Sequence, residues 1–221
     1  MDAPEPKPSG TVVVLRDAPH LEVLLLQRCP RDGKEGAWVF PGGKLERIDR
    51  VPGASDSDRA RRAAVREAQE EAGLLLESDA LVEIARWITP PVSPKRFDTW
   101  FFATAIEPDT EIQVDGDEMC GHGWQRPSDA LAAHHAGERR LAPPTFVTVT
   151  WLDAFQQASQ ALETLPDRKP LPFRPRIQRI EEGACILYPG DAGYESDDHD
   201  APGARHRLWT LKSGWRYERD D

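Results

Sequence analysis

Two apolar runs stand near the start of the chain, separated by a short polar turn. Residues 11–16 and 21–28 are rich in β-branched and aliphatic side chains, and residues 17–20 between them include a proline. Such runs bounded by turn residues predict two β-strands, apolar enough to be central in a sheet. A third, short strand at 38–40 runs into a Pro-Gly-Gly loop. Residues 1–10 are proline-rich and are expected to be mobile.

An amphipathic helix is predicted from about Asp58 to Ala72. Residues 55–58 are all serine or aspartate and offer several N-caps, while Gly73 can adopt the left-handed conformation that ends a helix. The next expected elements are a strand at 81–89, a strand at 98–106, an acidic loop at 109–119 and a short helix at 130–135.

The pattern changes after residue 140. Apolar side chains recur every three to four residues from 143 to 165, which predicts one long helix. A proline-rich linker follows at 166–175. Two or three strands are predicted after it, at 177–180, at 185–188 and in a hairpin near 212–215. The acidic segment 191–200 is expected to be a flexible loop.

Composition narrows the possible functions. A chain of 221 residues can form one large domain, and its formal net charge of −10 argues against binding a nucleic-acid backbone, which attracts Lys and Arg. No apolar run approaches the ~20 residues of a membrane span, and no signal peptide is recognised, so neither a membrane nor secretion is expected. Cys29, Cys120 and Cys185 lack metal or redox spacing and are predicted to be reduced thiols in a cytoplasmic protein.

The predicted helix at 58–72 concentrates three glutamates on one face. At 3.6 residues per turn, Glu67, Glu70 and Glu71 fall within an arc of roughly 100°. Like charges four residues apart destabilise a helix unless something neutralises them. Carboxylate oxygens favour Mg²⁺, Ca²⁺ or Mn²⁺ over zinc, and a few carboxylates with water suit Mg²⁺ shared with a substrate phosphate. The alternative is a solvated acidic face paired with arginines of the same helix.

Gly42-Gly43, a polar connection and Arg66-Glu67-Ala68-Gln69-Glu70-Glu71-Ala72-Gly73-Leu74 resemble the Nudix box, G-x5-E-x7-R-E-U-x-E-E-x-G-U. The resemblance implies an α/β fold: the Nudix α/β/α sandwich, with a mixed β-sheet between helices, over residues 11–140. The box would span 43–74. Residues 141–221 would then form a helix-plus-strand extension packed on that core.

The first half of the box departs from the family pattern. Counting seven residues back from Arg66 places Asp58 where the pattern has glutamate, and fourteen residues rather than five lie between Gly43 and Asp58. An insertion of nine residues is therefore predicted within 44–57. The spacing from Arg66 to Leu74, which sets the helix geometry, matches the pattern.

Other stretches are similar to an expanded-box branch of the family that includes a mammalian peroxisomal coenzyme A diphosphatase. They are Leu24-Leu25-Leu26-Gln27-Arg28, Val39-Phe40-Pro41-Gly42-Gly43, Trp87-Ile88-Thr89-Pro90, Arg96-Phe97-Asp98-Thr99, Leu141-Ala142-Pro143-Pro144 and Leu187-Tyr188-Pro189-Gly190-Asp191. This resemblance implies metal-dependent hydrolysis of coenzyme A or acyl-coenzyme A to 3′,5′-ADP and a 4′-phosphopantetheine derivative. ADP-ribose, NADH or a related nucleoside diphosphate derivative is the alternative substrate, and a non-catalytic nucleotide-binding module is the alternative class.

The resemblance also implies roles for single residues. Glu67 and Glu71 are expected to be the principal ligands of Mg²⁺ or Mn²⁺. Glu70 would be a further metal ligand or the base that positions water, and Arg66 would brace these carboxylates. Glu118 is the candidate base or ligand from outside the helix.

Several assignments stay open from sequence. Asp115 and Asp117 are close rivals of Glu118, and each of the three acids could equally be a solvated surface charge. Arg28 and Arg96 are candidates for gripping phosphates, because guanidinium pairs with phosphate through two hydrogen bonds.

The remaining candidates concern the backbone and the aromatic residues. Gly42 and Gly43 could turn backbone groups toward the metal site or form a plain turn. Trp38, Phe97 and Trp100 could stack on adenine, although the core is their default place. Residues 141–221 could shape the substrate cleft or a homodimer contact.

Overall fold

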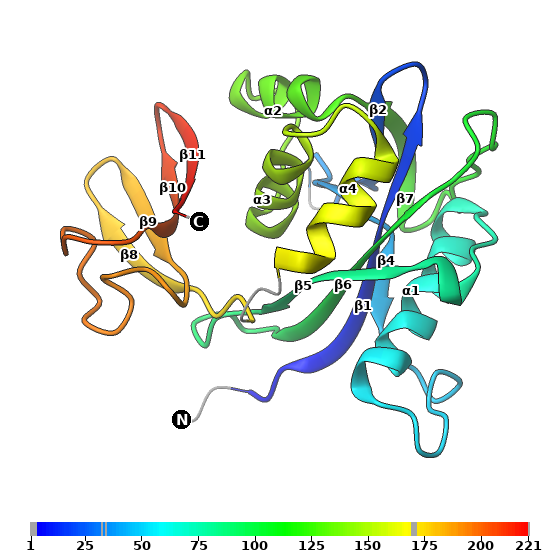
Figure 1. The fold of residues 1–221 in the computed structure, drawn as a ribbon, viewed down its shortest axis with the longest axis horizontal. Helices are drawn as coiled ribbons and strands as arrows, with labels where there is room; N and C mark the ends of the chain where they lie inside the picture. The colour runs from blue at the N-terminus through cyan, green and yellow to red at the C-terminus, as the bar shows by residue number, and fades with distance from the viewer. Residues whose placement is uncertain (1–3, 32, 34, 169–171, 221) are drawn as a thin grey trace.

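The computed structural model describes residues 4–31, 33, 35–168 and 172–220. Two β-sheets make up its framework, a mixed one that carries most of the core and a smaller antiparallel one built by the C-terminal part of the chain (Figure 1). Helix α1 covers one face of the mixed sheet, and α3 and α4 cover the other (Figure 1). This arrangement confirms the predicted α/β/α sandwich.

Within the described residues the mixed sheet has seven strands, with the central order β3-β2-β1-β6-β5. Strand β1 pairs parallel with β6 and antiparallel with β2 and β4, and β7 is added beside β2. The strands are β1 (Lys7–Asp17), β2 (Leu21–Arg28), β3 (Trp38–Val39), β4 (Gly42–Lys44), β5 (Val82–Ile88), β6 (Phe97–Ala105) and β7 (Met119–Gln125). Because Val12 and Val14 face α1 while Val13 and Leu15 face the other layer, β1 is buried on both sides.

The first strand begins earlier than the sequence suggested. Residues 7–10 were expected to be mobile, but β1 starts at Lys7, with Ser9 opposite Lys44 and Gly10 opposite Gly43. Strand β7 was not predicted, because two glycines interrupt its apolar pattern; it is a strand because it pairs with β2. The Pro-Gly-Gly segment predicted as a loop contributes the short strand β4.

Helix α1 (Asp56–Ala72) starts and ends close to its predicted bounds. Ser55 accepts a hydrogen bond from the backbone N–H of Asp58, and the Asp58 carboxylate accepts one from the backbone N–H of Ser55, which forms a capping box. Gly73 closes the helix in the left-handed conformation (φ 70°). The small face that packs on the sheet consists of Ala60, Ala64, Ala68 and Ala72.

The second helical layer differs from the single helix predicted at 143–165. The chain forms α2 (Pro127–His135), α3 (Pro143–Leu152), α4 (Ala158–Thr164) and a 3-10 turn, η2 (Leu165–Arg168); a second 3-10 turn, η1 (Ser78–Ala80), precedes β5. The break between α3 and α4 is made by contacts with the sheet. Asp17 accepts from the backbone N–H of Ala158, and the Gln156 carbonyl accepts from Leu21. The single-helix prediction was wrong because sequence periodicity does not register such tertiary contacts.

The C-terminal sheet has four antiparallel strands within the described residues: β8 (Arg176–Ile180), β9 (Gly183–Leu187), β10 (His206–Leu211) and β11 (Gly214–Arg219). Phe173 joins it to the edge of the mixed sheet, because its N–H donates to the Arg86 carbonyl and its carbonyl accepts from Ile88. Tyr188 and Leu208 belong to the same apolar core as α3 and α4. The extension is therefore packed on the larger sheet.

The acidic segment 191–200 is anchored rather than flexible, contrary to the prediction. The Asp191 carboxylate is buried and accepts from Arg207 at 2.6 and 2.7 Å, from the N–H of His206 at 2.8 Å and from the N–H of Gly193 at 2.9 Å. Burial by itself would raise the pKa of Asp191, but these hydrogen bonds lower it below its ordinary value. The buried ion pair between Asp191 and Arg207 thus fixes the start of segment 191–200 to strand β10.

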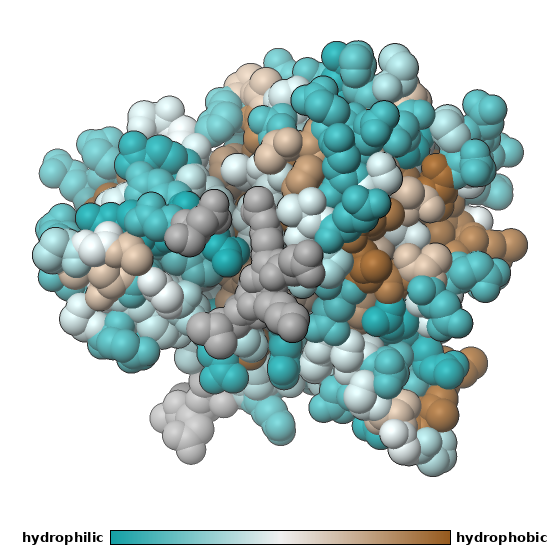
Figure 2. All heavy atoms as spheres, viewed as in Figure 1, coloured by the Kyte–Doolittle hydropathy of each residue, from teal (hydrophilic) through white to brown (hydrophobic). Residues whose placement is uncertain are grey.

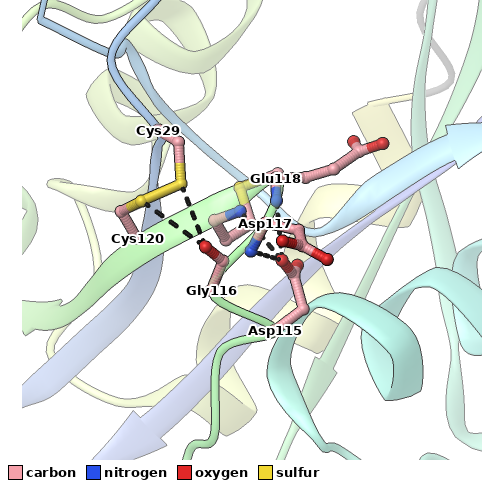
Figure 3. Close-up of a disulfide and its surroundings, with 7 residues drawn as sticks. Cys29, Asp115, Gly116, Asp117, Glu118 and Cys120 are labelled. Carbon is pink, nitrogen blue, oxygen red and sulfur yellow. Dashed lines mark hydrogen bonds between the residues drawn. A yellow bond between two sulfur atoms is a disulfide. The ribbon is translucent and has the colours of Figure 1, made fainter.

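A disulfide joins Cys29 to Cys120, which corrects the prediction of reduced thiols (Figure 3). Residues 91 positions apart meet here because β2 and β7 are neighbours in the sheet, and Cys29 follows the last residue of β2. Cys185 is buried and free.

Reducing this disulfide should lower the free energy of unfolding by about 2–4 kcal/mol, because the bridge closes a long loop and restricts the unfolded chain. Denaturant unfolding with and without dithiothreitol measures the change. The Cys29→Ser, Cys120→Ser double variant is the control. Its free energy of unfolding should equal that of the reduced protein and should not change when dithiothreitol is added. A wild-type transition that does not move on reduction would contradict the expectation.

The surface matches the high content of charged residues. Figure 2 shows a largely hydrophilic face, with hydrophobic residues gathered mainly on the side where α1 lies in Figure 1. Among the helices that the structure describes, none combines the length and apolar character that crossing a bilayer requires.

Candidate active site

Glu71 is the most buried acid of helix α1. Its side chain is 4% exposed, and one carboxylate oxygen accepts a hydrogen bond from the backbone N–H of Gly42 at 2.9 Å. The pKa of Glu71 is raised to about 7. Burial is the main cause, the charges of Glu67 and Glu118 add to the rise, and the Gly42 hydrogen bond and the charge of Arg28 oppose it. Helix α1 and strand β4 therefore hold a carboxylate where negative charge is costly.

Glu67 lies one helical turn before Glu71 and against the same strand. A methyl group added at Gly43 would collide with the Glu67 carboxylate, so the glycine makes this close approach possible. Burial raises the pKa of Glu67, with contributions from Glu70 and Glu118, while Arg66 opposes the rise. The glycines of the predicted box thus bring backbone against two carboxylates of α1.

Arg66 holds the carboxylates in place, as its predicted bracing role requires. One of its Nη atoms donates to Glu67 at 2.9 Å and to Glu70 at 2.7 Å, and the other donates to the Lys44 carbonyl at 3.0 Å. The same side chain pairs with Asp49 at 3.2 Å. Glu70 is the outermost of the three glutamates, with a side chain 56% exposed.

Asp49, which sequence reasoning missed, is the acid that pairs with Arg66. It is 3% exposed and also accepts from the backbone N–H of Glu46 at 2.8 Å. Five residues separate it from Gly43, as the first half of the box pattern requires. Asp58, which was placed at this position by counting back from Arg66, instead caps α1. This spacing favours nine extra residues after Asp49, in the later part of the predicted 44–57 insertion and beyond it.

Glu118 lies directly before strand β7, on a tight acidic turn. The Asp115 carboxylate accepts from the backbone N–H groups of Asp117 at 2.5 Å and Glu118 at 2.6 Å, and these hydrogen bonds lower the pKa of Asp115 against the effect of burial. In Figure 3 the Glu118 side chain extends away from the disulfide, while Asp115 is engaged with the turn. The charge of Glu118 raises the pKa of both Glu67 and Glu71, so this loop acts electrostatically on the helix carboxylates.

The two candidate arginines are placed differently. Arg28 is exposed at the end of β2, and its charge acts on Glu71, so it is positioned to meet an anionic ligand. Arg96 instead donates to the backbone carbonyls of Thr89 at 3.0 Å and Pro4 at 2.7 Å. These contacts anchor the start of the chain beside β6.

The three aromatic residues considered for stacking on adenine also lie in different environments. Trp38 and Trp100 are buried, and each is covered by a guanidinium, from Arg139 at 4.0 Å and from Arg86 at 4.3 Å. Phe97 is half-buried and lines a cavity of about 510 Å³. That cavity also has Gly42 and Arg28 in its wall, so it adjoins the surroundings of Glu71.

The donor set suits a hard divalent cation. Its members are carboxylates, and burial, together with the charges of neighbouring acids, raises the pKa values of Glu67 and Glu71. Within the described residues, however, no group of three or more His, Cys, Asp or Glu side chains is spaced to hold an ion. Arg66 holds Glu67 and Glu70 in this structure, so either carboxylate would have to exchange that contact for a cation.

Comparisons with known proteins agree with this geometry. The NUDIX domain profile matches residues 6–144. The chain is similar to acyl-coenzyme A diphosphatase NUDT19 of Homo sapiens, with 32% identity over 188 residues, 79% of this chain and 48% of that protein. It is 27% identical over 125 residues to the NUDT19 of Xenopus laevis, 53% of this chain and 33% of that protein. The matches thus span less than half the length of both relatives.

A solved structure shares the fold. The NUDIX hydrolase from Alicyclobacillus acidocaldarius superposes with a TM-score of 0.65 at 26% identity, covering 73% of this chain and 97% of that one. Nudix hydrolases generally use divalent metal ions, which agrees with the acidic donor set of α1. On its domain match, its fold and its hydrolase relatives, the chain belongs to the Nudix family and is a hydrolase of diphosphate bonds.

Proposed function

We propose that this Nudix hydrolase cleaves the diphosphate of coenzyme A or acyl-coenzyme A into 3′,5′-ADP and a 4′-phosphopantetheine or acyl-phosphopantetheine. The observation that carries the proposal is the similarity to a human acyl-coenzyme A diphosphatase across 79% of the chain. The buried acidic face of α1 supports it, because a hydrolase that attacks a diphosphate must neutralise the phosphate oxygens.

Glu67, Glu70 and Glu71 are the side chains that would hold Mg²⁺ or Mn²⁺. The ion would supply positive charge to the diphosphate oxygens and lower the pKa of attacking water. Arg66 keeps two of the three carboxylates oriented through hydrogen bonds of 2.7 and 2.9 Å. The Gly42 N–H fixes Glu71 from the strand side.

Glu118 and Glu70 are the candidates for the base that accepts the proton of the attacking water. Glu118 would reach the site from a turn held by Asp115, and Glu70 has the most exposed carboxylate of the three glutamates at 67–71. Arg28 is the candidate for contacting a phosphate, because it is exposed and its charge acts on Glu71.

Incubation of the purified chain with coenzyme A and Mg²⁺, followed by chromatography, tests the proposal. We expect release of 3′,5′-ADP, and no release would overturn the coenzyme A assignment. A parallel panel with ADP-ribose and NADH identifies the alternative substrates by their initial rates. The panel repeated with Mn²⁺, and with a chelator, defines the metal requirement.

Replacing Asp49 by asparagine should lower kcat/KM for coenzyme A by roughly 10- to 100-fold, because groups behind the metal ligands orient them. Asparagine keeps the size of the side chain but leaves Arg66 without its buried counter-charge. Asp58→Asn is the matched control and should retain the wild-type rate, since Asp58 caps the helix far along the chain from the glutamates. Equal rates in the two variants would contradict the pairing of Asp49 with the site.

A further inference from the structure

A mainly apolar cavity of about 510 Å³ adjoins the carboxylates. Its size lies in the range of pockets that bind small ligands. Walls from the mixed sheet include Trp87, Phe97 and Phe101, and the first turn of α3 contributes Pro143 and Pro144. Aromatic and aliphatic side chains thus make up most of its surface.

The cavity is joined to the site of hydrolysis by two shared residues. Gly42 lines the cavity and donates its N–H to Glu71, and Arg28 lines it while its charge acts on the same carboxylate. A ligand whose diphosphate lies at Glu71 can therefore extend one of its two halves into this space.

The C-terminal sheet completes the wall with aliphatic side chains. Ile177 of β8 and Ile186 of β9 are directly opposed in the register, and both line the cavity. Ile186 is 6% exposed, whereas Ile177 is 44% exposed, which is unusual for an isoleucine. Its position on the rim leaves apolar surface that an apolar ligand would cover.

Apart from one guanidinium, the polar side chains of the wall are hydroxyls, and two of these are bonded within the protein. The Thr89 hydroxyl accepts from the N–H of Phe97 at 3.0 Å, and the Thr99 hydroxyl is bonded to Ser9 at 2.7 Å. Arg28 is the one charged side chain among the described lining residues. One face of the Trp87 ring is covered by Phe173, with ring centroids 3.8 Å apart, so that face cannot stack on adenine. The wall suits a flexible aliphatic chain.

We infer that this cavity binds the aliphatic acyl chain of a thioester substrate, and that Ile177 and Ile186 of the C-terminal sheet select acylated over unacylated coenzyme A. The inference rests on the proposed function, and it places the acyl-phosphopantetheine half of the substrate in this cavity. It also assigns a specificity role to strands that lie beyond residue 144, where the family match ends.

Steady-state hydrolysis of coenzyme A, acetyl-coenzyme A and octanoyl-coenzyme A by the full chain tests the inference. We expect kcat/KM to be at least about tenfold higher for the octanoyl ester than for coenzyme A, because each methylene held in an apolar pocket adds to discrimination. In Ile177→Asp this ratio should fall to about one. Ile177→Thr, which keeps β-branching, should give an intermediate ratio.

Leu75→Asp is the matched control, because Leu75 is 82% exposed and is not part of the cavity wall. It should keep the wild-type ratio, and denaturant unfolding of each variant verifies the fold. Coenzyme A hydrolysed at the same kcat/KM as its octanoyl ester would overturn the inference and leave the proposed function standing. An equal loss on both substrates in Ile177→Asp would show that the cavity holds a part common to both, and would also overturn it. No hydrolysis of coenzyme A or its esters would overturn the proposed function and the inference with it.

Discussion

Replacing Glu71 by glutamine is expected to lower kcat/KM for coenzyme A by roughly 10²–10³-fold, the loss found when one preorganised electrostatic contact to a transition state is removed. Glu71 is 4% exposed beside two other acids, and burial holds its pKa near 7. A buried carboxylate with a raised pKa is costly to a fold, which agrees with the proposed role of Glu71 as a metal ligand.

The glutamine variant should remain folded. Glutamine has nearly the same shape, and its carbonyl oxygen can accept the Gly42 N–H that now reaches the carboxylate. Denaturant unfolding should therefore show equal or greater stability, because a buried charge has been removed. Titration with Mn²⁺ should show weaker binding than in the wild type.

Glu163→Gln is the matched control for this prediction. Glu163 is an exposed glutamate of helix α4, in the opposite layer of the sandwich, and its replacement should leave both rate and Mn²⁺ affinity unchanged. Activity of Glu71→Gln within a few-fold of the wild type would remove Glu71 from the site. If Glu71→Gln did not unfold cooperatively, the carboxylate would be needed for the fold, and this would contradict its proposed role in catalysis.

The largest loss of stability is expected from Asp191→Ala, about 3–5 kcal/mol, because breaking one partner of a buried ion pair leaves the other charge unpaired. Asp191 and Arg207 have side chains 0% and 2% exposed, and two hydrogen bonds of 2.6 and 2.7 Å join them. The same carboxylate also loses its bonds to the backbone of Gly193 and His206.

Urea unfolding of the full chain measures this effect, with Asp200→Asn as the control. Asp200 belongs to the same acidic segment, but its side chain is 88% exposed and faces His199 at 3.8 Å. Exposed ion pairs are worth little, so the control should shift the transition by less than about 1 kcal/mol. Equal effects of the two substitutions would mean that the Asp191–Arg207 pair does not hold the connection to β10.

The first helix shows how much of the site a sequence can predict. Its bounds were close because its signals are local: serine and aspartate at the start, glycine at the end and small residues on the packed face. The same local spacing placed Glu67, Glu70, Glu71 and Arg66 on one face. In the structure Arg66 donates to Glu67 and Glu70, while Glu71 accepts from the backbone N–H of Gly42.

The misplaced features depend on contacts between distant segments. Counting residues backwards from Arg66 could not identify Asp49, because only the folded loop reveals which acid pairs with the guanidinium. The break between α3 and α4 depends on Asp17, which lies 141 positions from the N–H that it caps. Asp191 belongs to an acidic run that resembles a solvated loop, and its partner Arg207 lies 16 positions away, so the sequence pattern did not indicate the ion pair.

The bridge between Cys29 and Cys120 has a practical consequence for anyone who prepares this protein. Cys120 is exposed, and both sulfurs lie next to the turn that carries Glu118. Material purified from an oxidising host and material purified with a thiol in every buffer differ by two hydrogen atoms at that turn. Rates measured on the two samples therefore belong to two chemical species. The mass of the intact protein should be measured for each sample, so that every rate is assigned to the oxidised or the reduced form.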